Sequence, residues 1–172
     1  MDARQLRDLQ APLKERYRSE PGSAVTSVAA TARWIEPGIT TTVDGFTGPI
    51  RAGLHPAAGG DGSDACSGDL LLQALLACLG VTLRSVATMG SVELADVELR
   101  ATATFDASGT LGVDRSAPVG VSRIDVEIAA VTTVEDNAIA RLLATTERYC
   151  VVGQSLAQPP HLTFRRKIPT RE

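Results

Sequence analysis

The sequence has few of the residues and segments that mark several common classes of protein. Aromatic residues make up only 3% of it, so its core must depend on aliphatic side chains. Its two histidines, His55 and His161, do not flank a cysteine at ligand spacing, and there is no CxxC motif to suggest zinc. No apolar segment follows the polar N-terminus, as a secretion signal would require. We therefore expect a cytoplasmic protein with no metal site.

An excess of charge of one sign and a long hydrophobic run are also missing. Seventeen basic and twenty acidic residues give a net charge of −3, which offers no general attraction to nucleic acid. The most apolar stretch, residues 70–83, is interrupted by Gln73 and is shorter than the roughly 18 residues of a membrane span. We expect no nucleic-acid or membrane partner, and we expect this stretch to form a buried helix.

Hydrophobic periodicity predicts one domain of the α+β class. The expected order is a helix at 2–20, a hairpin at 25–34 and 39–43 with a short strand at 49–52, a glycine-rich loop at 54–68, a helix at 69–89, antiparallel strands at 97–105 and 124–128, a helix at 135–149 and a strand at 162–165. The predicted domains are an N-terminal helical arm, 1–24, and a main domain, 25–172. The arm could pack on the body, pack on a second subunit, or be a plain surface helix.

Two of the three cysteines are predicted to point inward. Cys78 lies within the helix 69–89, which is apolar on nearly every face, so it should be inside the protein or at a subunit interface. Cys150 continues the apolar stripe of the helix 135–149. An inward cysteine often merely fills space, and the pattern alone leaves that alternative open.

Cys66 differs from the other two because it precedes the helix 69–89. About ten helical residues would hold it roughly 15 Å from Cys78, well beyond the roughly 7 Å that Cα atoms of a disulfide allow. The N-terminus of a helix lowers the pKa of a nearby thiol, whereas the negative charge of Asp69 would raise the pKa of Cys66. Cys66 is thus either a second redox centre or a structural neighbour of the helix cap.

Two segments carry a resemblance to a known family. The runs SGDLLLQALLAC, residues 67–78, and ERYCVVGQSL, residues 147–156, resemble the OsmC/Ohr family, and the resemblance extends over roughly residues 25–168. In that family an acidic residue opens the central helix and a cysteine follows about nine or ten residues later. A second cysteine begins a Cys-Pro-Val-like segment, where this chain has Val151 in place of proline.

The resemblance implies an OsmC-like fold, with antiparallel sheets around a buried central helix, in an intertwined homodimer. It implies reduction of organic hydroperoxides as a defence against oxidative stress. Cys78 would attack the peroxide and Cys150 would resolve the resulting sulfenic acid, with Asp69 as the acidic residue of the motif. An external dithiol, often lipoyl-linked in the family, would restore the thiols, and no bound cofactor would be needed.

The arginine that activates the first cysteine in the family has no clear counterpart here. Arg33 is the first candidate and Arg51 the second, although either could be a solvated surface residue. The missing arginine signal and Val151 support an alternative function. In that alternative the chain is a non-catalytic OsmC-like protein that binds a small hydrophobic ligand at the dimer interface.

Overall fold

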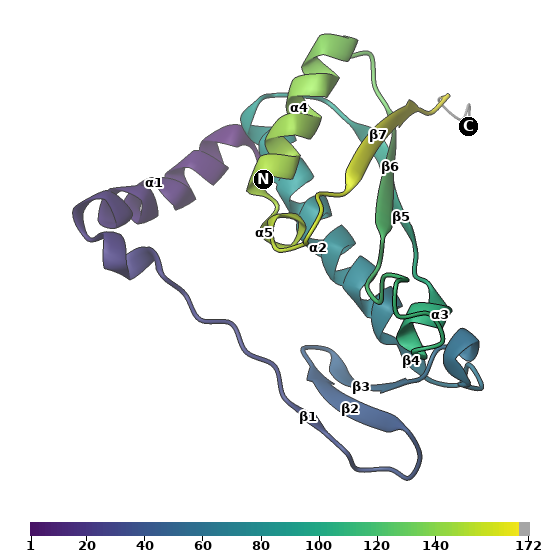
Figure 1. Cartoon of the computed structure of the whole chain (residues 1–172). Coiled ribbons are helices and arrows are strands. Elements are labelled where there is room, and N and C mark those ends of the chain that lie inside the picture. The colour runs from purple at the N-terminus through teal and green to yellow at the C-terminus, as the bar shows by residue number, and fades with distance from the viewer. Residues whose placement is uncertain (169–172) are drawn as a thin grey trace. The chain divides into compact units, whose positions relative to one another are not determined.

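The computed structural model describes residues 1–168 and divides the chain into two compact units. Unit 1 contains Met1–Ser27, Leu75–Thr102 and the described residues from Asp125 onward. Unit 2 contains Val28–Ala74 and Ala103–Ile124. The alternation of helices and strands confirms the predicted α+β class (Figure 1).

Unit 1 begins with helix α1, Ala3–Ser19, which confirms the predicted N-terminal helix. The Asp2 side chain accepts a hydrogen bond from the Gln5 N–H at 2.8 Å, and the Gln5 side chain accepts one from the Asp2 N–H at 2.9 Å. This reciprocal pair is a capping box. The helix continues through Pro12, and none of its residues is buried. A short 3-10 helix, η1, spans Pro21–Ala24.

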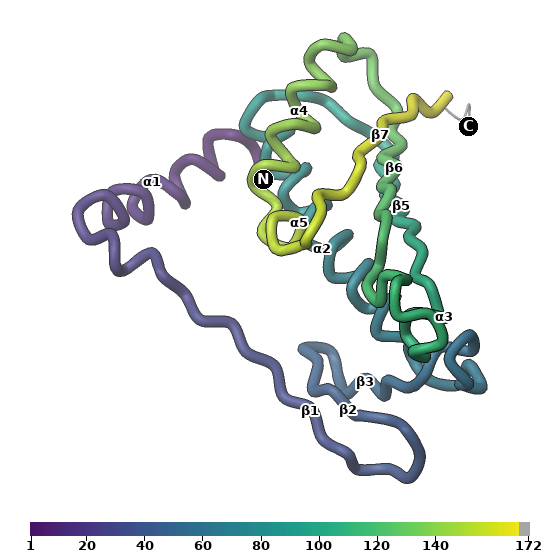
Figure 2. Tube along the Cα trace, viewed as in Figure 1, coloured from purple at the N-terminus to yellow at the C-terminus, as the bar shows by residue number. Residues whose placement is uncertain are grey.

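The core of unit 1 is a three-stranded sheet with helices packed on it. The strands lie in the order β5 (Ala95–Thr104), β6 (Arg123–Val131), β7 (His161–Arg166). Strands β5 and β6 are hydrogen-bonded neighbours, as predicted, whereas β6 and β7 are parallel, from Asp125 opposite His161 to Ala130 opposite Arg166. This sheet is therefore mixed, because the chain returns to β7 through a helical crossover, α4 (Asp136–Tyr149) and α5 (Val151–Gln154). Figure 2 follows that path.

Unit 2 contains a four-stranded sheet in the order β1 (Ala32–Arg33), β2 (Thr40–Gly45), β3 (Gly48–Gly53), β4 (Ala65–Cys66). The predicted hairpin is present, but its first strand has two residues instead of ten. Strands β3 and β4 are parallel. Two short helices, η2 (Pro56–Ala58) and α3 (Ala107–Thr110), complete the unit.

Helix α2, Ser67–Met89, confirms the predicted central helix but not its complete burial. Its buried side chains are Leu75, Leu79, Leu83 and Ala87, which are spaced by four and form one stripe. Val81, outside that stripe, is 73% exposed. By length and composition alone α2 is apolar enough to cross a membrane, a property that central helices of soluble proteins share.

Candidate active site

Cys78 lies near the middle of α2 and is half-buried. Its carbonyl accepts a hydrogen bond from the Thr82 hydroxyl at 2.8 Å, within the helix. Leu75 and Leu79, on the turns around it, are fully buried. The cysteine is thus held on a rigid part of the fold, at the margin of the core of unit 1.

Cys150 is fully buried, as predicted, but it is not on the stripe of a helix. Helix α4 ends at Tyr149, because Cys150 has an extended backbone with φ −76° and ψ 103°. The same residue is the N-cap of α5, and its Sγ accepts a hydrogen bond from the Gly153 N–H at 3.3 Å. Cys150 therefore sits at the junction of two helices, where its sulfur replaces the oxygen of an ordinary cap.

Gly153 allows this close approach of the α5 backbone to the sulfur. A Cβ added at position 153 would lie 3.3 Å from the Sγ of Cys150 and 3.7 Å from a methyl group of Leu75. The first distance is tighter than almost all real Cβ contacts, so a side chain here would displace the thiol.

The two thiols interact, and their pKa values shift in opposite directions. Burial raises the pKa of Cys78, but hydrogen bonds from the Val152 N–H, the Cys150 thiol and the Val151 N–H outweigh burial and bring the pKa below its ordinary value. Burial raises the pKa of Cys150, and the neighbouring Cys78 raises it further, despite the Gly153 N–H. Of the pair, Cys78 is therefore the thiol that loses its proton more readily.

The backbone groups of α5 are the part of this site that sequence reasoning missed. Val151 stood out in the sequence only as a departure from the family's proline and Val152 did not stand out at all, yet hydrogen bonds from the backbone N–H groups of Val152 and Val151 lower the pKa of Cys78. A signal was present in the sequence: a proline at position 151, common in the family, has no N–H to donate. Valine adds a donor at this position.

Asp69 lies in the first turn of α2, as expected, and its side chain is exposed. It precedes Cys78 by nine residues, or roughly two and a half helical turns. A carboxylate in the first turn stabilises a helix because it interacts favourably with the positive end of the helix dipole. The catalytic role implied for Asp69 stays a prediction.

The candidate activating arginines both belong to unit 2 and both pair with carboxylates there. Arg33, on β1, donates to Asp44 at 2.8 Å, and both side chains are about half exposed. Arg51, on β3, bridges Glu36 at 2.9 Å and Asp64 at 2.8 Å. The role of Arg33 stays a prediction.

Cys66 ends β4 and is half-buried, and all three cysteines are free thiols. It lines an apolar cavity of about 350 Å³ in unit 2, together with His55 and Phe105, whose rings meet edge to face at 5.1 Å. Within residues 1–168, no three histidine, cysteine or carboxylate side chains gather in a group that could hold a metal ion.

Several solved structures share the fold of this chain over most of its length. An OsmC-like protein from Mycoplasma pneumoniae is 14% identical, with a TM-score of 0.67, and the match covers 82% of this chain and 97% of that one. An organic hydroperoxide resistance protein from Legionella pneumophila is 18% identical, with a TM-score of 0.58 and coverages of 84% and 99%. The organic hydroperoxide resistance protein OhrB of Bacillus subtilis is 16% identical, with a TM-score of 0.56 and coverages of 84% and 100%.

At this level of identity the structures establish the fold alone. No curated protein matches the sequence. The family described as OsmC-like protein matches residues 60–165, a segment that includes α2 with Cys78 and the α4–α5 junction with Cys150. That segment is more than half of the chain, and the chain therefore belongs to the OsmC-like protein family.

Proposed function

We propose that this protein is a cytoplasmic thiol-dependent peroxidase that reduces organic hydroperoxides and so protects against oxidative stress. The observation that carries the proposal is the pairing of two thiols with opposite pKa shifts, Cys78 lowered and Cys150 raised. Two cysteines that only fill space in a core do not require hydrogen-bond donors around one of the two sulfurs. Two of the relatives of similar fold are organic hydroperoxide resistance proteins, which agrees with this chemistry.

The proposed reaction has two steps on the protein. The Cys78 thiolate attacks one oxygen of the peroxide, the O–O bond breaks, and the alcohol leaves after taking a proton, so Cys78 becomes a sulfenic acid. The Cys150 thiol then attacks the Cys78 sulfur, the S–O bond breaks, and water leaves as the disulfide forms. An external dithiol, possessing two reducing equivalents, restores both thiols and is itself oxidised to a disulfide.

The positions of the two thiols suit this division of roles. Cys78 is half-buried, which permits access by a peroxide, while Cys150 is fully buried and protected from direct oxidation. Hydrogen bonds from the N–H groups of Val152 and Val151 favour the thiolate form of Cys78.

The test is turnover of an organic hydroperoxide, such as cumene hydroperoxide, with dihydrolipoamide in excess. We expect wild-type protein to turn over and Cys78→Ser to lose all activity. With the dithiol omitted, Cys150→Ser should consume about two equivalents of peroxide and then stop, because one equivalent forms the sulfenic acid at Cys78 and a second converts it to a sulfinic acid that mass spectrometry detects. Cys66→Ser is the matched control and should keep full activity. Turnover by Cys78→Ser at the wild-type rate would refute the proposal.

We also propose that the protein works as a homodimer. The support is apolar surface left uncovered in unit 2 of the single chain, where Trp34 and Phe46 are 91% and 107% exposed. Trp34 is the single tryptophan and so reports on this surface. Sedimentation shows at which protein concentrations the dimer dissociates, and the tryptophan emission should shift to longer wavelength over the same range of dilution. If the protein is a dimer and its emission is typical of an exposed tryptophan at every concentration, Trp34 is not part of the interface.

A further inference from the structure

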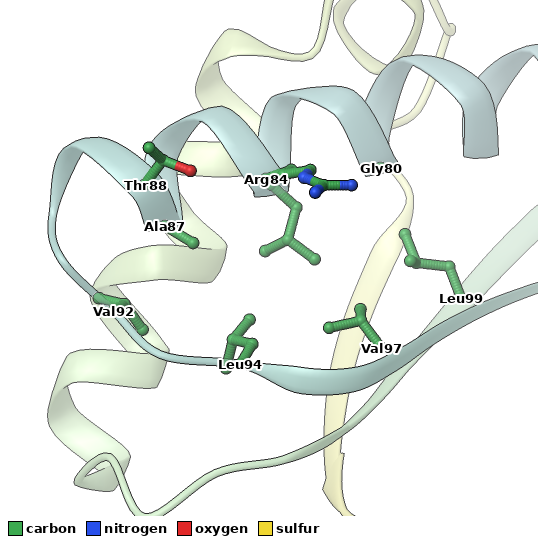
Figure 3. Close-up of a pocket in the computed structure, with 9 residues that line it drawn as sticks. Gly80, Arg84, Ala87, Thr88, Val92, Leu94, Val97 and Leu99 are labelled. Atoms are coloured by element: carbon green, nitrogen blue, oxygen red, sulfur yellow. The ribbon is translucent and has the colours of Figure 1, made fainter. Parts of the chain in front are cut away.

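A cavity of about 500 Å³ lies within unit 1, between the C-terminal half of α2 and the segment that leads into β5 (Figure 3). Every residue that lines it belongs to unit 1, so its shape is fixed by one compact body. Its volume falls in the range of roughly 300 to 1,000 Å³ found for small-molecule sites. None of the three cysteines lines it.

Most of the residues that line the cavity have aliphatic side chains. Figure 3 shows Leu94, Val97 and Leu99 directed from the strand segment toward the helix. Val97 and Leu99 share one face of β5, because side chains alternate along a strand. On the helix side, Gly80 leaves room: a Cβ there would meet only a methyl group of Leu99, at 3.9 Å. These walls suit a flexible apolar chain.

One charged residue, Arg84, lines this cavity and is exposed, as Figure 3 shows. Arg84 makes no hydrogen bond or ion pair with any residue of the described part of the chain, 1–168. The acidic residues of β5 are engaged elsewhere, because Asp96 and Glu98 pair with Lys167 at 3.1 and 3.3 Å. The cavity therefore combines aliphatic side chains with the guanidinium of one exposed arginine that has no ion-pair partner within residues 1–168.

The cavity is on a different side of α2 from Cys78. With about 100° of rotation per residue, Gly80 is about 200° and Arg84 about 240° around the helix from Cys78. A molecule in the cavity would thus be separated from the thiol pair by the helix itself. Its binding should not depend on the state of the thiols.

We propose that this cavity binds a carboxylate with a medium-length apolar tail, such as a medium-chain fatty acid. The planar guanidinium of Arg84 would hold the carboxylate through two parallel hydrogen bonds, with the Thr88 hydroxyl on the same helix as a further donor. The tail would lie against Leu94, Val97 and Leu99, out of water. This binding function is separate from the peroxidase activity and does not rest on it.

The test is calorimetric titration of the full-length protein with decanoate below the concentration at which decanoate aggregates. We expect one site per chain, and binding at least tenfold weaker in Arg84→Met. Arg141→Met is the matched control, because Arg141 is an exposed arginine of α4 that does not line the cavity; it should bind as the wild type does. Decanol, which lacks the charge, should also bind at least tenfold more weakly than decanoate.

A second variant tests the walls independently of the charge. Val97→Phe fills the cavity from a position that is 42% exposed, so the fold should survive, as circular dichroism can verify. We expect it to lose decanoate binding, whereas Cys78→Ser should retain it. Absence of binding by the wild type, equal affinity in Arg84→Met and Arg141→Met, or full binding by folded Val97→Phe would each overturn the proposal.

Discussion

The two units of this chain differ sharply in how much of their surface they bury. Six large side chains are fully buried, and all belong to unit 1: Leu75, Leu79, Val126, Ile128, Thr146 and Cys150. In unit 2, which the structure describes in full, Ala52 is the single buried residue. Unit 1 therefore has its own hydrophobic core, whereas the sheet of unit 2 lacks one within the single chain.

This difference shows which groups of the candidate site are held in place by a hydrophobic core. The thiol pair lies in the unit with the core, where α2 and α5 fix both sulfurs and the N–H groups around them. The arginine candidates lie in the unit without a core, on exposed strands where carboxylates pair with them. Preorganised polar groups stabilise charge better than mobile surface ones. We infer that thiolate formation depends first on unit 1.

The largest expected effect tests the contrast in burial. Leu75→Ala should lower the free energy of unfolding by about 2 to 5 kcal/mol, because it removes a fully buried side chain and leaves a cavity. Phe46→Ala in unit 2 should change it by about 0.5 kcal/mol or less, because Phe46 is fully exposed. Urea unfolding, at a dilution where the protein is monomeric, measures both. Equal losses would show that the contrast is wrong.

The next effect tests the backbone donors of unit 1. Val151→Pro removes one N–H from the surroundings of Cys78, and the first position of a helix such as α5 tolerates proline. The pKa of Cys78 should rise, so that its thiolate fraction at neutral pH falls and its alkylation by iodoacetamide becomes slower. Val151→Ala keeps the N–H and is the control, since this side chain is 73% exposed. An unchanged alkylation midpoint in Val151→Pro would remove the Val151 N–H from the site.

The same contrast explains what the sequence could and could not predict. The helices at 2–20, 69–89 and 135–149 were predicted within two residues of their ends, because their periodicity is strong and local. Unit 2 was predicted less well: of the expected strand 25–34 only Ala32–Arg33 forms, because a run of valine and threonine favours a strand only where a neighbour pairs with it. Pairing partners are not visible in local sequence.

The candidate site also contains features that local sequence patterns could not predict. Helical phase predicted that Cys150 points inward, and its complete burial confirms this. The break between α4 and α5, and the N–H groups that α5 directs at Cys78, depend on backbone angles at Cys150 that no periodicity encodes. Periodicity reports which face is buried, whereas donors to a thiolate depend on the path of the chain between elements.

Arg33, the candidate cation of unit 2, should contribute little to the stability of the protein. Arg33→Met breaks an exposed ion pair with Asp44 and should cost about 1 kcal/mol of stability or less. If Arg33 activates Cys78, the same variant should slow oxidation of Cys78 by peroxide about tenfold, equivalent to about 1.4 kcal/mol in the barrier. Stopped-flow measurement of sulfenic acid formation compares Arg33→Met with the wild type and with Arg51→Met, the variant of the second candidate. Wild-type rates in Arg33→Met would mean that the N–H groups of α5 activate the thiolate without this arginine.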